Sequence, residues 1–176
     1  MKARIDDITT GNVAPRIIDI ASYADIDALN DLLNHCASKM AHQGMRHWLG
    51  VYDKQSVTAN VQKKMVYTMR DKGCIVACVA LASMPASYYD DCWPTAPKAD
   101  CYMTMLAVSP DYQQQGLGKL MVQYCQRQIP TGKTLQLDAV AHYPALLDFY
   151  RQLGFQQIAD GIGLGDKRFL FSWSAK

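Results

Sequence analysis

The sequence predicts a single mixed α/β (α+β) domain over residues 1–176, in which helices flank a mostly antiparallel central sheet. Three observations lead to this prediction. A chain of 176 residues can bury a hydrophobic core as one domain. Its 49% hydrophobic and 19% charged residues are typical of a globular protein. Strand-like and helix-like segments follow one another without an internal repeat or a domain linker.

The N-terminal part predicts one strand and two helices. Pro15–Ile20 has the pattern of a strand, and the Ser-x-x-Asp signal of Ser22–Asp25 marks the start of a helix. Apolar residues then recur at steps of three and four, which indicates an amphipathic helix through Ile26, Leu29, Leu33, Cys36 and Met40. After a loop, the sequence predicts a second helix from about Ser56 to Arg70.

The middle of the chain is rich in strands. Lys72 and Gly73 turn the chain into the apolar strand Cys74–Ala82, for which Ser87–Tyr89 is a candidate hairpin partner. Two prolines make Asp90–Lys98 a loop. The next strand is Cys101–Val108, which ends at Ser109-Pro110-Asp111.

The C-terminal part alternates helices with strands. A glycine-containing turn opens a helix that reaches about Ile129, and Thr134–Val140 is a strand. Pro144–Leu153 is predicted to be a short helix, because it starts with a proline and is followed by Gly154. Phe155–Ile158 and Arg168–Trp173 are expected to close the sheet as a hairpin.

Charge and hydropathy argue against several classes of protein. A net charge of +2 without a Lys/Arg block does not favour nucleic acid or an anionic membrane. The longest apolar run, Cys74–Ala82, is about half of the ~20 residues that a membrane span needs. The first residues lack a secretory signal, so we expect a cytoplasmic protein. The six cysteines lack metal-ligand spacing, which predicts free thiols, no metal, and a buried pair at Cys74 and Cys78.

One segment has the features of an anion site. It combines a strand, a turn with Gly116 and Gly118, and the start of a helix. The first amide N–H groups of a helix lack partners, its dipole is positive at that end, and glycines let an anion come close. Lys119 could add a charge. The segment lacks the early glycine and hydroxyl of a P-loop and the third glycine of a dinucleotide fingerprint.

Two blocks of sequence connect this segment with a known family. The first runs from Leu106-Ala107-Val108 to Gln113-Gln114-Gln115-Gly116-Leu117-Gly118 and fits a Gln/Arg-x-x-Gly-x-Gly/Ala signature after a strand. The second is a strand, then His142-Tyr143-Pro144-Ala145, then Tyr150-Arg151-Gln152-Leu153-Gly154-Phe155. Together they resemble the GNAT superfamily of acetyl-CoA-dependent N-acetyltransferases, strongly over about residues 101–158 and more weakly, through the order of elements, over the rest.

The resemblance implies a fold, a co-substrate and site residues. The fold would be that of a GNAT acyl-CoA N-acyltransferase, and the co-substrate would be acetyl-CoA. The pantetheine arm would bind the backbone of Leu106, Ala107 and Val108. The pyrophosphate would bind the backbone amides of Gln113, Gln114, Gln115, Gly116, Leu117 and Gly118, with Lys119. Tyr150 matches the family tyrosine that protonates the departing thiolate, although its place on the helix would also suit the core. Ala145 and His142 fall in the second cofactor-binding block.

Some positions depart from the family or leave alternatives open. His142 stands where the family usually has Asn, so it would either contact the cofactor or lie on the surface. Tyr102 stands where some members have a carboxylate base. Asp100, Asp90 and Asp91 are alternative bases that would also suit solvated turns, and a chain of water molecules is an equal alternative. Gly161–Gly165 is expected to be a hairpin tip, and Trp48 either walls the acceptor site or packs in the core.

These features lead to one functional prediction. We expect direct transfer of an acetyl group from acetyl-CoA to a primary amine of a small molecule, in a ternary complex without a metal. Tyr88, Tyr89, Trp93 and the Pro94–Pro97 loop would shape the acceptor pocket. The alternatives are a protein or peptide N-acetyltransferase and a non-catalytic acyl-CoA-binding module. We expect no nucleic acid or membrane partner, and a homodimer is left open.

Overall fold

The structure is a computed structural model that describes residues 3–4 and 16–176. The strands are β1 (Ala3–Arg4), β2 (Ile17–Ile20), β3 (Met65–Asp71), β4 (Cys74–Ala82), β5 (Cys101–Val108), β6 (Thr134–Val140), β7 (Gln156–Gly163) and β8 (Asp166–Ser174). The helices are α1 (Ile26–His42), α2 (Lys54–Lys63), α3 (Tyr89–Cys92), α4 (Leu117–Gln128) and α5 (Pro144–Gln152), with 3-10 turns at Tyr23–Asp25 and Pro110–Tyr112.

The chain divides into two compact units. The first comprises residues 1–80 and 105–121, and the second comprises residues 81–104 and 122–176, so β5 and α4 each contribute to both. Strands β1-β2-β3-β4 follow one another in the first unit, and β5-β6-β8-β7 follow one another in the second. β5 and β6 are parallel, whereas the pairs β1–β2, β2–β3, β6–β8 and β7–β8 are antiparallel. The predicted class, a mixed and mostly antiparallel sheet with flanking helices, is confirmed, while the extent of one domain stays a prediction.

The predicted helix from Ser56 to Arg70 is wrong in its second half. α2 ends at Lys63, and β3 follows at once and pairs antiparallel with β2. Two causes favour the strand. The segment Val66-Tyr67-Thr68 consists of β-branched and aromatic residues, which suit a strand. The next turn, Lys72-Gly73, has positive φ at both residues (47° and 85°), the geometry that joins tight hairpins.

This hairpin also determines which strand lies next to β4 in the sheet. β3 and β4 are neighbours in the sheet, so the predicted hairpin partner Ser87–Tyr89 is wrong. Tyr89 instead begins the short helix α3. The segment after β4 is therefore free to pack across the sheet of the second unit.

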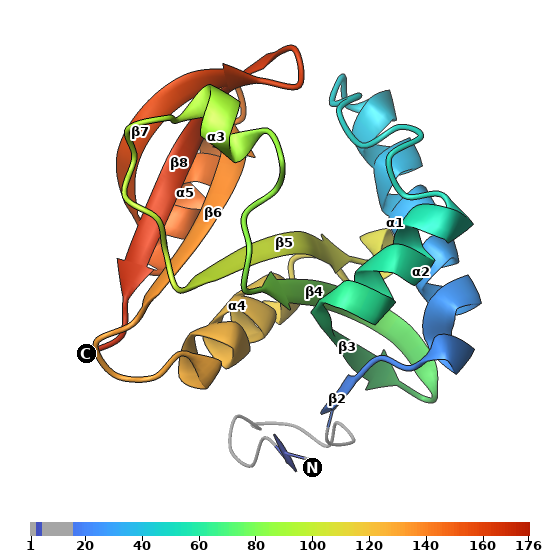
Figure 1. The fold of residues 1–176 in the computed structure, drawn as a ribbon. Coiled ribbons are helices and arrows are strands. Elements are labelled where there is room, and N and C mark those ends of the chain that lie inside the picture. The colour runs from blue at the N-terminus through green and yellow to red at the C-terminus, as the bar shows by residue number, and fades with distance from the viewer. Residues whose placement is uncertain (1–2, 5–15) are drawn as a thin grey trace. The chain divides into compact units, whose positions relative to one another are not determined.

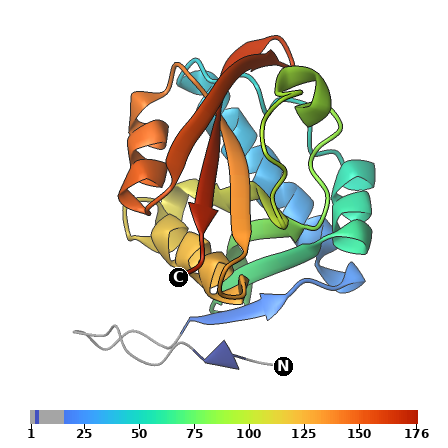
Figure 2. The ribbon, with the colours of Figure 1, turned by 60° about the vertical axis from the view of Figure 1, so that its left-hand side comes forward.

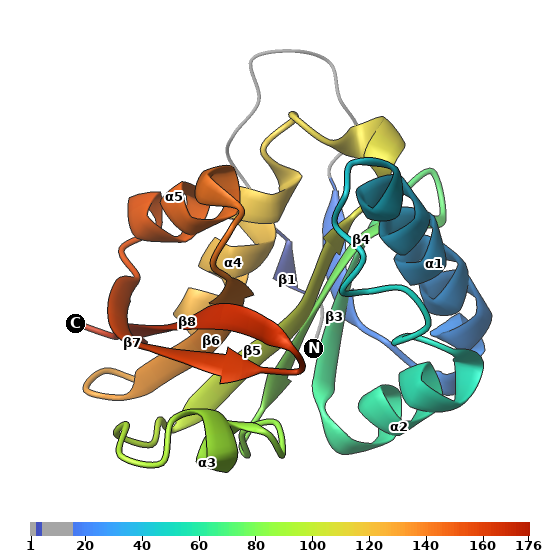
Figure 3. The same ribbon diagram turned by 90° about the horizontal axis from the view of Figure 1, so that it is seen from above.

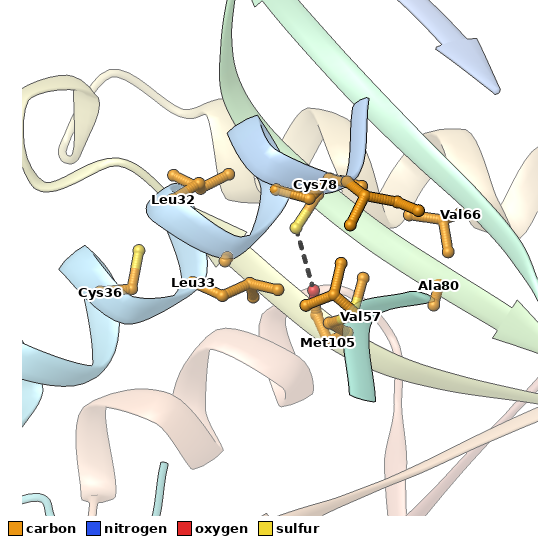
Figure 4. Packing of buried hydrophobic residues seen from close by; sticks show 11 residues of the cluster. Leu32, Leu33, Cys36, Val57, Val66, Cys78, Ala80 and Met105 are labelled. Atoms are coloured by element: carbon orange, nitrogen blue, oxygen red, sulfur yellow. Dashed lines mark hydrogen bonds between the residues drawn. The ribbon is translucent and has the colours of Figure 1, made fainter. Parts of the chain in front are cut away.

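The core of the first unit lies between its two helices and its strands. Figure 1 shows α1 and α2 on one side of β3 and β4. α1 contributes five of the eleven buried side chains, and α2 contributes Val57. Figure 4 shows these residues converging on the strands, where the Cys78 thiol donates to the Met105 carbonyl oxygen at 3.5 Å. The predicted capping signal is confirmed, because the Ser22 amide and hydroxyl donate to the Asp25 carboxylate at 2.8 and 3.1 Å.

The second unit has helices on both faces of its strands. Figures 2 and 3 show α5 on one face of β6, β8 and β7, and Figure 3 shows α3 on the other. Neighbouring side chains of β8 point to opposite faces. Leu170 packs with Tyr89 and Trp93 near α3, whereas the Phe171 ring lies 6.0 Å from the Tyr150 ring of α5.

The glycine-rich segment Gly161–Gly165 is only partly a hairpin tip. β7 extends through Gly163, and the turn consists of Leu164 and Gly165, with φ of 54° and 83°. Gly161 is held inside the strand, because a Cβ added there would lie 2.7 Å from the Cys92 carbonyl oxygen. The two glycines of β7 therefore allow α3 to pack closely on the strand, and they do not form a phosphate loop.

The six cysteines are free thiols, as predicted, but they are not equally buried. Cys78 is buried, whereas Cys74 is exposed at the start of β4, so the expected buried pair is wrong. Within residues 3–4 and 16–176, no helix is both long and apolar enough to cross a membrane. No group of three metal-binding side chains occurs in the same ranges.

Candidate active site

The end of β5 has an irregular backbone. Met105 adopts a left-handed conformation with φ of 59°, which is strained for a residue other than glycine. This residue lies directly before Leu106, Ala107 and Val108, the predicted pantetheine-binding segment. The Val108 carbonyl oxygen accepts from the Cys36 thiol at 3.3 Å and from the Gln113 side-chain amide at 3.2 Å. Side chains of the first unit thus fix the point at which the strand ends.

A short 3-10 turn leads from β5 into the glycine loop. The Ser109 amide donates to the Val76 carbonyl oxygen at 2.8 Å, which ties this turn to β4. The Tyr112 hydroxyl donates to the Asp71 carboxylate at 3.0 Å, which ties it to β3. These bonds anchor the start of the loop on the sheet of the first unit.

The loop itself has two left-handed residues, Gln114 (φ 61°) and Gly116 (φ 78°). A Cβ added to Gly116 would meet no protein atom within 4 Å, so the space above this glycine is open. The side chains of the three glutamines and of Lys119 are exposed, and Leu117 is buried beneath them. The loop therefore presents backbone, and not side-chain bulk, on its outer side.

The amides of this loop and of the first turn of α4 are unpaired within the described part of the chain. The first backbone hydrogen bond of α4 runs from the Leu120 amide to the Gly116 carbonyl oxygen, at 3.1 Å. None of the residues described here accepts from the amides of Gln114 to Lys119. Such amides, at the positive end of the helix dipole, form an anion-binding surface. The geometry therefore suits the predicted pyrophosphate role of residues 113–119.

The remaining predicted residues lie in the second unit. Tyr150 is 7% exposed, and its ring packs edge-on to Phe149 and Phe155 at centroid distances of 5.2 and 6.0 Å. Its carbonyl oxygen accepts from the amides of Leu153 and Phe155 at 3.1 Å each, where α5 ends. The spacing from Tyr150 to Phe155 in the predicted motif is thus also the spacing of a helix end.

His142 and Ala145 lie at the start of α5. His142 is an exposed residue whose Nε2 atom is 3.4 Å from the Asp166 carboxylate, next to the β7–β8 turn. Its ring packs edge-on to Tyr143 at 5.4 Å. Ala145 is exposed on the first turn of the helix. Residues 106–119 thus come together in the first unit, and His142, Ala145 and Tyr150 in the second; their cofactor roles stay predictions.

The candidate bases are engaged in other contacts. Asp100 accepts from the Lys133 ammonium at 2.9 Å and from the Thr134 amide and hydroxyl at 2.9 and 3.1 Å. The hydrogen bond from Lys133, followed by that from the Thr134 amide, lowers the pKa of Asp100, which makes this carboxylate a poor proton acceptor. Asp90 lies 3.4 Å from Lys98, and both are exposed. The Tyr102 hydroxyl accepts from the Ala99 amide at 3.0 Å.

A buried polar cluster in the second unit was missed by the sequence reasoning. Both Tyr88 and Tyr89 donate their hydroxyls to one oxygen of Asp138 at 2.8 Å, and Arg168 donates to the other at 2.7 Å. The Arg168 Nε group donates to the Gly163 carbonyl oxygen at 2.9 Å. The side chains of Arg168 and Asp138 are only 9% and 8% exposed. The lone acid Asp138 in the apolar strand β6 was the available signal, whereas β8 contains both Lys167 and Arg168.

The electrostatics of this cluster follow from its burial. Burial, followed by the charge of Asp138, raises the pKa of Tyr89 well above its usual value, so this phenol stays a donor. Burial lowers the pKa of Arg168, but its hydrogen bond and charge contact with Asp138 outweigh that effect and raise it. The cluster thus joins α3, β6 and β8 through satisfied charges, which is the arrangement that a buried ion pair needs.

The aromatic residues near α3 form a small cavity. Tyr89 packs edge-on to Trp93 and Tyr102, at centroid distances of 5.0 and 5.6 Å. These three rings line a cavity of about 30 Å³, together with Pro85, Pro94, Pro97 and Leu170. The Trp93 indole N–H is buried and has no hydrogen-bond partner in the part of the chain that the structure describes. Trp48, by contrast, packs against the core of the first unit and lies 5.0 Å from the Tyr52 ring, which is a core role.

Comparison with known families identifies the chain. The acetyltransferase (GNAT) domain profile matches residues 62–157, which are more than half of the 176 residues. The chain belongs to the GNAT family. The GNAT protein is therefore an acyltransferase enzyme, in a family that uses acetyl-CoA.

Individual relatives agree with the family assignment. The N-acetyltransferase YesJ of Bacillus subtilis is 28% identical over 142 residues, which cover 77% of this chain and 79% of YesJ. A GNAT-family acetyltransferase structure from Streptococcus agalactiae superposes with a TM-score of 0.79 at 15% identity, covering 94% of this chain and 98% of that one. The PaiA N-acetyltransferase of Thermoplasma acidophilum, solved with coenzyme A, has a TM-score of 0.68 at 13% identity, with coverages of 92% and 99%. At these identities the two structures show the shared fold.

Proposed function

We propose that this GNAT protein transfers an acetyl group from acetyl-CoA to a primary amine of a small molecule. The observation that supports this most directly is the loop from Gln113 to Lys119. The amides of Gln114 to Lys119 are unpaired among the described residues, and the space above Gly116 is open. An uncapped helix start behind an open glycine suits a diphosphate better than it suits a purely structural turn.

The residues present fit coenzyme A in charge as well as in shape. The loop carries no carboxylate between Gln113 and Lys119, and the first turn of α4 contains no acidic residue. Leu106, Ala107 and Val108 would hold the pantetheine arm through their backbone. When bound, acetyl-CoA would supply a thioester as the activated acetyl donor. The chain itself would supply binding, orientation and a proton donor.

Tyr150 is the proposed proton donor. Its ring is fixed by packing against Phe149, Phe155 and Phe171, so its hydroxyl has little freedom. A phenol held in this way can donate its proton to the sulfur as the C–S bond breaks. This transfer would release CoA with a neutral thiol group. The attacking amine would lose its proton to water, because Asp100 and Asp90 are already paired with Lys133 and Lys98.

The acceptor class rests on the second unit. Tyr89, Trp93 and Tyr102 provide apolar surface, and the cavity that they line also has the polar residues Asp90 and Gln136. We propose an amphipathic amine as acceptor, because the aromatic rings favour an apolar body and their faces also attract an ammonium group.

A turnover assay tests the proposal. Free thiol released from acetyl-CoA is followed with a panel of small primary amines that differ in apolar surface, alongside amine-bearing peptides. We expect release with at least one small amine and preference for the more apolar members. Preference for peptides would reassign the acceptor, and CoA binding without turnover on any amine would favour a non-catalytic binding module.

Tyr150→Phe tests the proposed acid within the same assay. We expect kcat to fall by roughly 10²–10⁴-fold, the range for lost general acid catalysis, while the Kd for CoA changes little. Phe149→Leu serves as a packing control on the same helix. Unchanged turnover of Tyr150→Phe would remove the proposed role, and an equal fall in both variants would assign the effect to packing.

A further inference from the structure

We propose that Arg16 is an additional phosphate ligand of coenzyme A, positioned over the glycine loop by Gln115. This inference rests on the proposed function, since it takes coenzyme A as the ligand. It adds a residue from the segment directly before β2, which is 99 residues away from the loop in sequence. Arg16 would supply the strong positive charge that the loop itself lacks.

The first argument is the contact with the loop. The Arg16 Nη2 group donates to the Gln115 side-chain oxygen at 3.0 Å. Gln115 belongs to the same loop whose amides are unpaired among the described residues. The guanidinium is therefore held beside the open space at Gly116, without a phosphate being needed to hold it there.

The second argument is an unused donor. The Arg16 Nε group is buried and has no hydrogen-bond partner among the described residues. Within the described part of the chain, no carboxylate forms an ion pair with Arg16 either. A buried donor that lacks its partner destabilises a protein, and more strongly when it is charged. An arginine kept in this state is most simply explained by a ligand that supplies the missing acceptor.

The third argument is the charge of the surroundings. Asp71, at the end of β3, accepts from the Tyr112 hydroxyl of the turn before the loop at 3.0 Å. Asp111 is the acidic residue on that turn itself, and among the described residues it forms no ion pair with Arg16. The hydrogen bond to Asp71 raises the pKa of Tyr112, and the positive charge of Arg16 opposes this rise. The guanidinium charge is therefore present next to the loop and is not cancelled there.

The chemistry of Gln115 supports the same role. A glutamine oxygen can orient a guanidinium but leaves its charge intact, whereas a glutamate would neutralise it. The planar guanidinium can then bind phosphate oxygens with two parallel N–H groups. Since Gln115 lies in the pyrophosphate loop, we assign Arg16 to the pyrophosphate and not to the 3′-phosphate of the adenosine.

Calorimetric titration tests this assignment. CoA and dephospho-CoA, which lacks the 3′-phosphate, are titrated into the wild-type protein, Arg16→Met and the control Arg127→Met. The control removes an equal charge from the exposed last turn of α4. We expect Arg16→Met to weaken both ligands by about 10- to 100-fold, the range for a lost bond to a charged group, and the control to change each by less than about 2-fold.

The outcomes separate the two proposals. If the wild-type protein binds neither ligand, the proposed function fails. If the wild-type protein binds CoA but Arg16→Met binds it equally well, the function stands and the role of Arg16 is wrong. A loss for CoA alone would overturn the pyrophosphate assignment. Thermal unfolding of the ligand-free proteins is a second readout: Arg16→Met should be no less stable than wild type, and a lower Tm would indicate a structural role.

A second variant keeps the inference testable if Arg16→Met misfolds. Gln115→Glu should pair with Arg16 and place a negative charge on the loop. We expect a Tm at least equal to that of wild type, and CoA binding weakened by about 10-fold or more. Wild-type affinity in this variant would overturn the proposed positioning of Arg16 by Gln115.

Discussion

Two helices of the first unit begin in opposite ways. At the start of α2, the Asp53 carboxylate accepts from the Ser56 amide at 2.7 Å, and Asp53 has the extended backbone of an ordinary N-cap. α4 begins after Gly116, whose φ is 78°. Among the described residues, the first amide of this helix that finds an acceptor is that of Leu120. The first turn of α4 carries Lys119 and no acidic residue, although a cation is unfavourable at that end of a helix.

The difference shows what each helix start is for. A side-chain cap stabilises a helix by about 1 kcal/mol and also blocks its amides. α2 has this stabilisation, and the 3-10 turn Tyr23–Asp25 that leads into α1 carries a capping box of Ser22 and Asp25. Among the described residues, no group accepts from the first amides of α4, so these amides stay available. The start of α4, which follows an open glycine, is therefore the candidate for binding.

The strongest test of this contrast is Gly116→Val. A β-branched residue is strained at positive φ by about 1–2 kcal/mol, and its side chain would fill the open space above the loop. We expect the Kd for CoA to rise by about 100-fold or more, measured by calorimetry. Circular dichroism verifies folding, and Gly132→Val, at a turn with φ of 78° outside the loop, controls for backbone strain. If the folded variant binds CoA as wild type does, the loop is not the binding surface.

Lys119→Glu should change the stability of the ligand-free protein and its affinity for CoA in opposite directions. A glutamate in the first turn favours the helix dipole and should raise the stability of the ligand-free protein by about 0.3–1 kcal/mol. The same charge should repel a diphosphate, so we expect CoA binding to weaken about 10-fold. Urea unfolding and calorimetry measure the two effects, with Lys119→Gln as the neutral control. Stability and affinity that rise together would contradict the proposed use of this helix start.

Asp53→Ala is the converse and smallest change. Loss of the α2 cap should lower the free energy of unfolding by about 1 kcal/mol and the Tm by about 2–4 °C. The Kd for CoA should stay within about 2-fold, because the α2 cap takes no part in the proposed loop. A variant with wild-type stability would show that the Asp53–Ser56 bond adds little, and a weakened CoA affinity would link the two helix starts.

The sequence was most informative where a backbone conformation requires a particular residue. Gly116 could be identified because a loop with φ of 78° before a helix favours glycine. The capping box at Ser22 and the bounds of β6 could be predicted for similar local reasons, since each depends on neighbouring residues. The family signature depends on the same kind of local pattern, which is why it is readable in one sequence.

Features made by distant residues could not be predicted. The recurrence of Val61, Met65 and Met69 at helical steps predicts a helix where β3 lies, and pairing with β2 adds to the local β-branched and aromatic residues in favour of a strand. The four residues of the Asp138 cluster come from α3 and the residue before it, from β6 and from β8. No local sequence pattern therefore contains all of them. The contact between Arg16 and Gln115 spans 99 residues and was likewise hidden.

The thiols differ in burial, which makes selective labelling with a fluorescent dye possible. Burial raises the pKa of Cys36 to about 11 and that of Cys125 to about 12, so both stay protonated and shielded near neutral pH. Cys74 is exposed at the start of β4. A maleimide dye should therefore attach there first, without engineered cysteines. It would place a fluorescent reporter in the same unit as the glycine loop. Ligand binding could then be followed in real time on a protein whose sequence is unchanged.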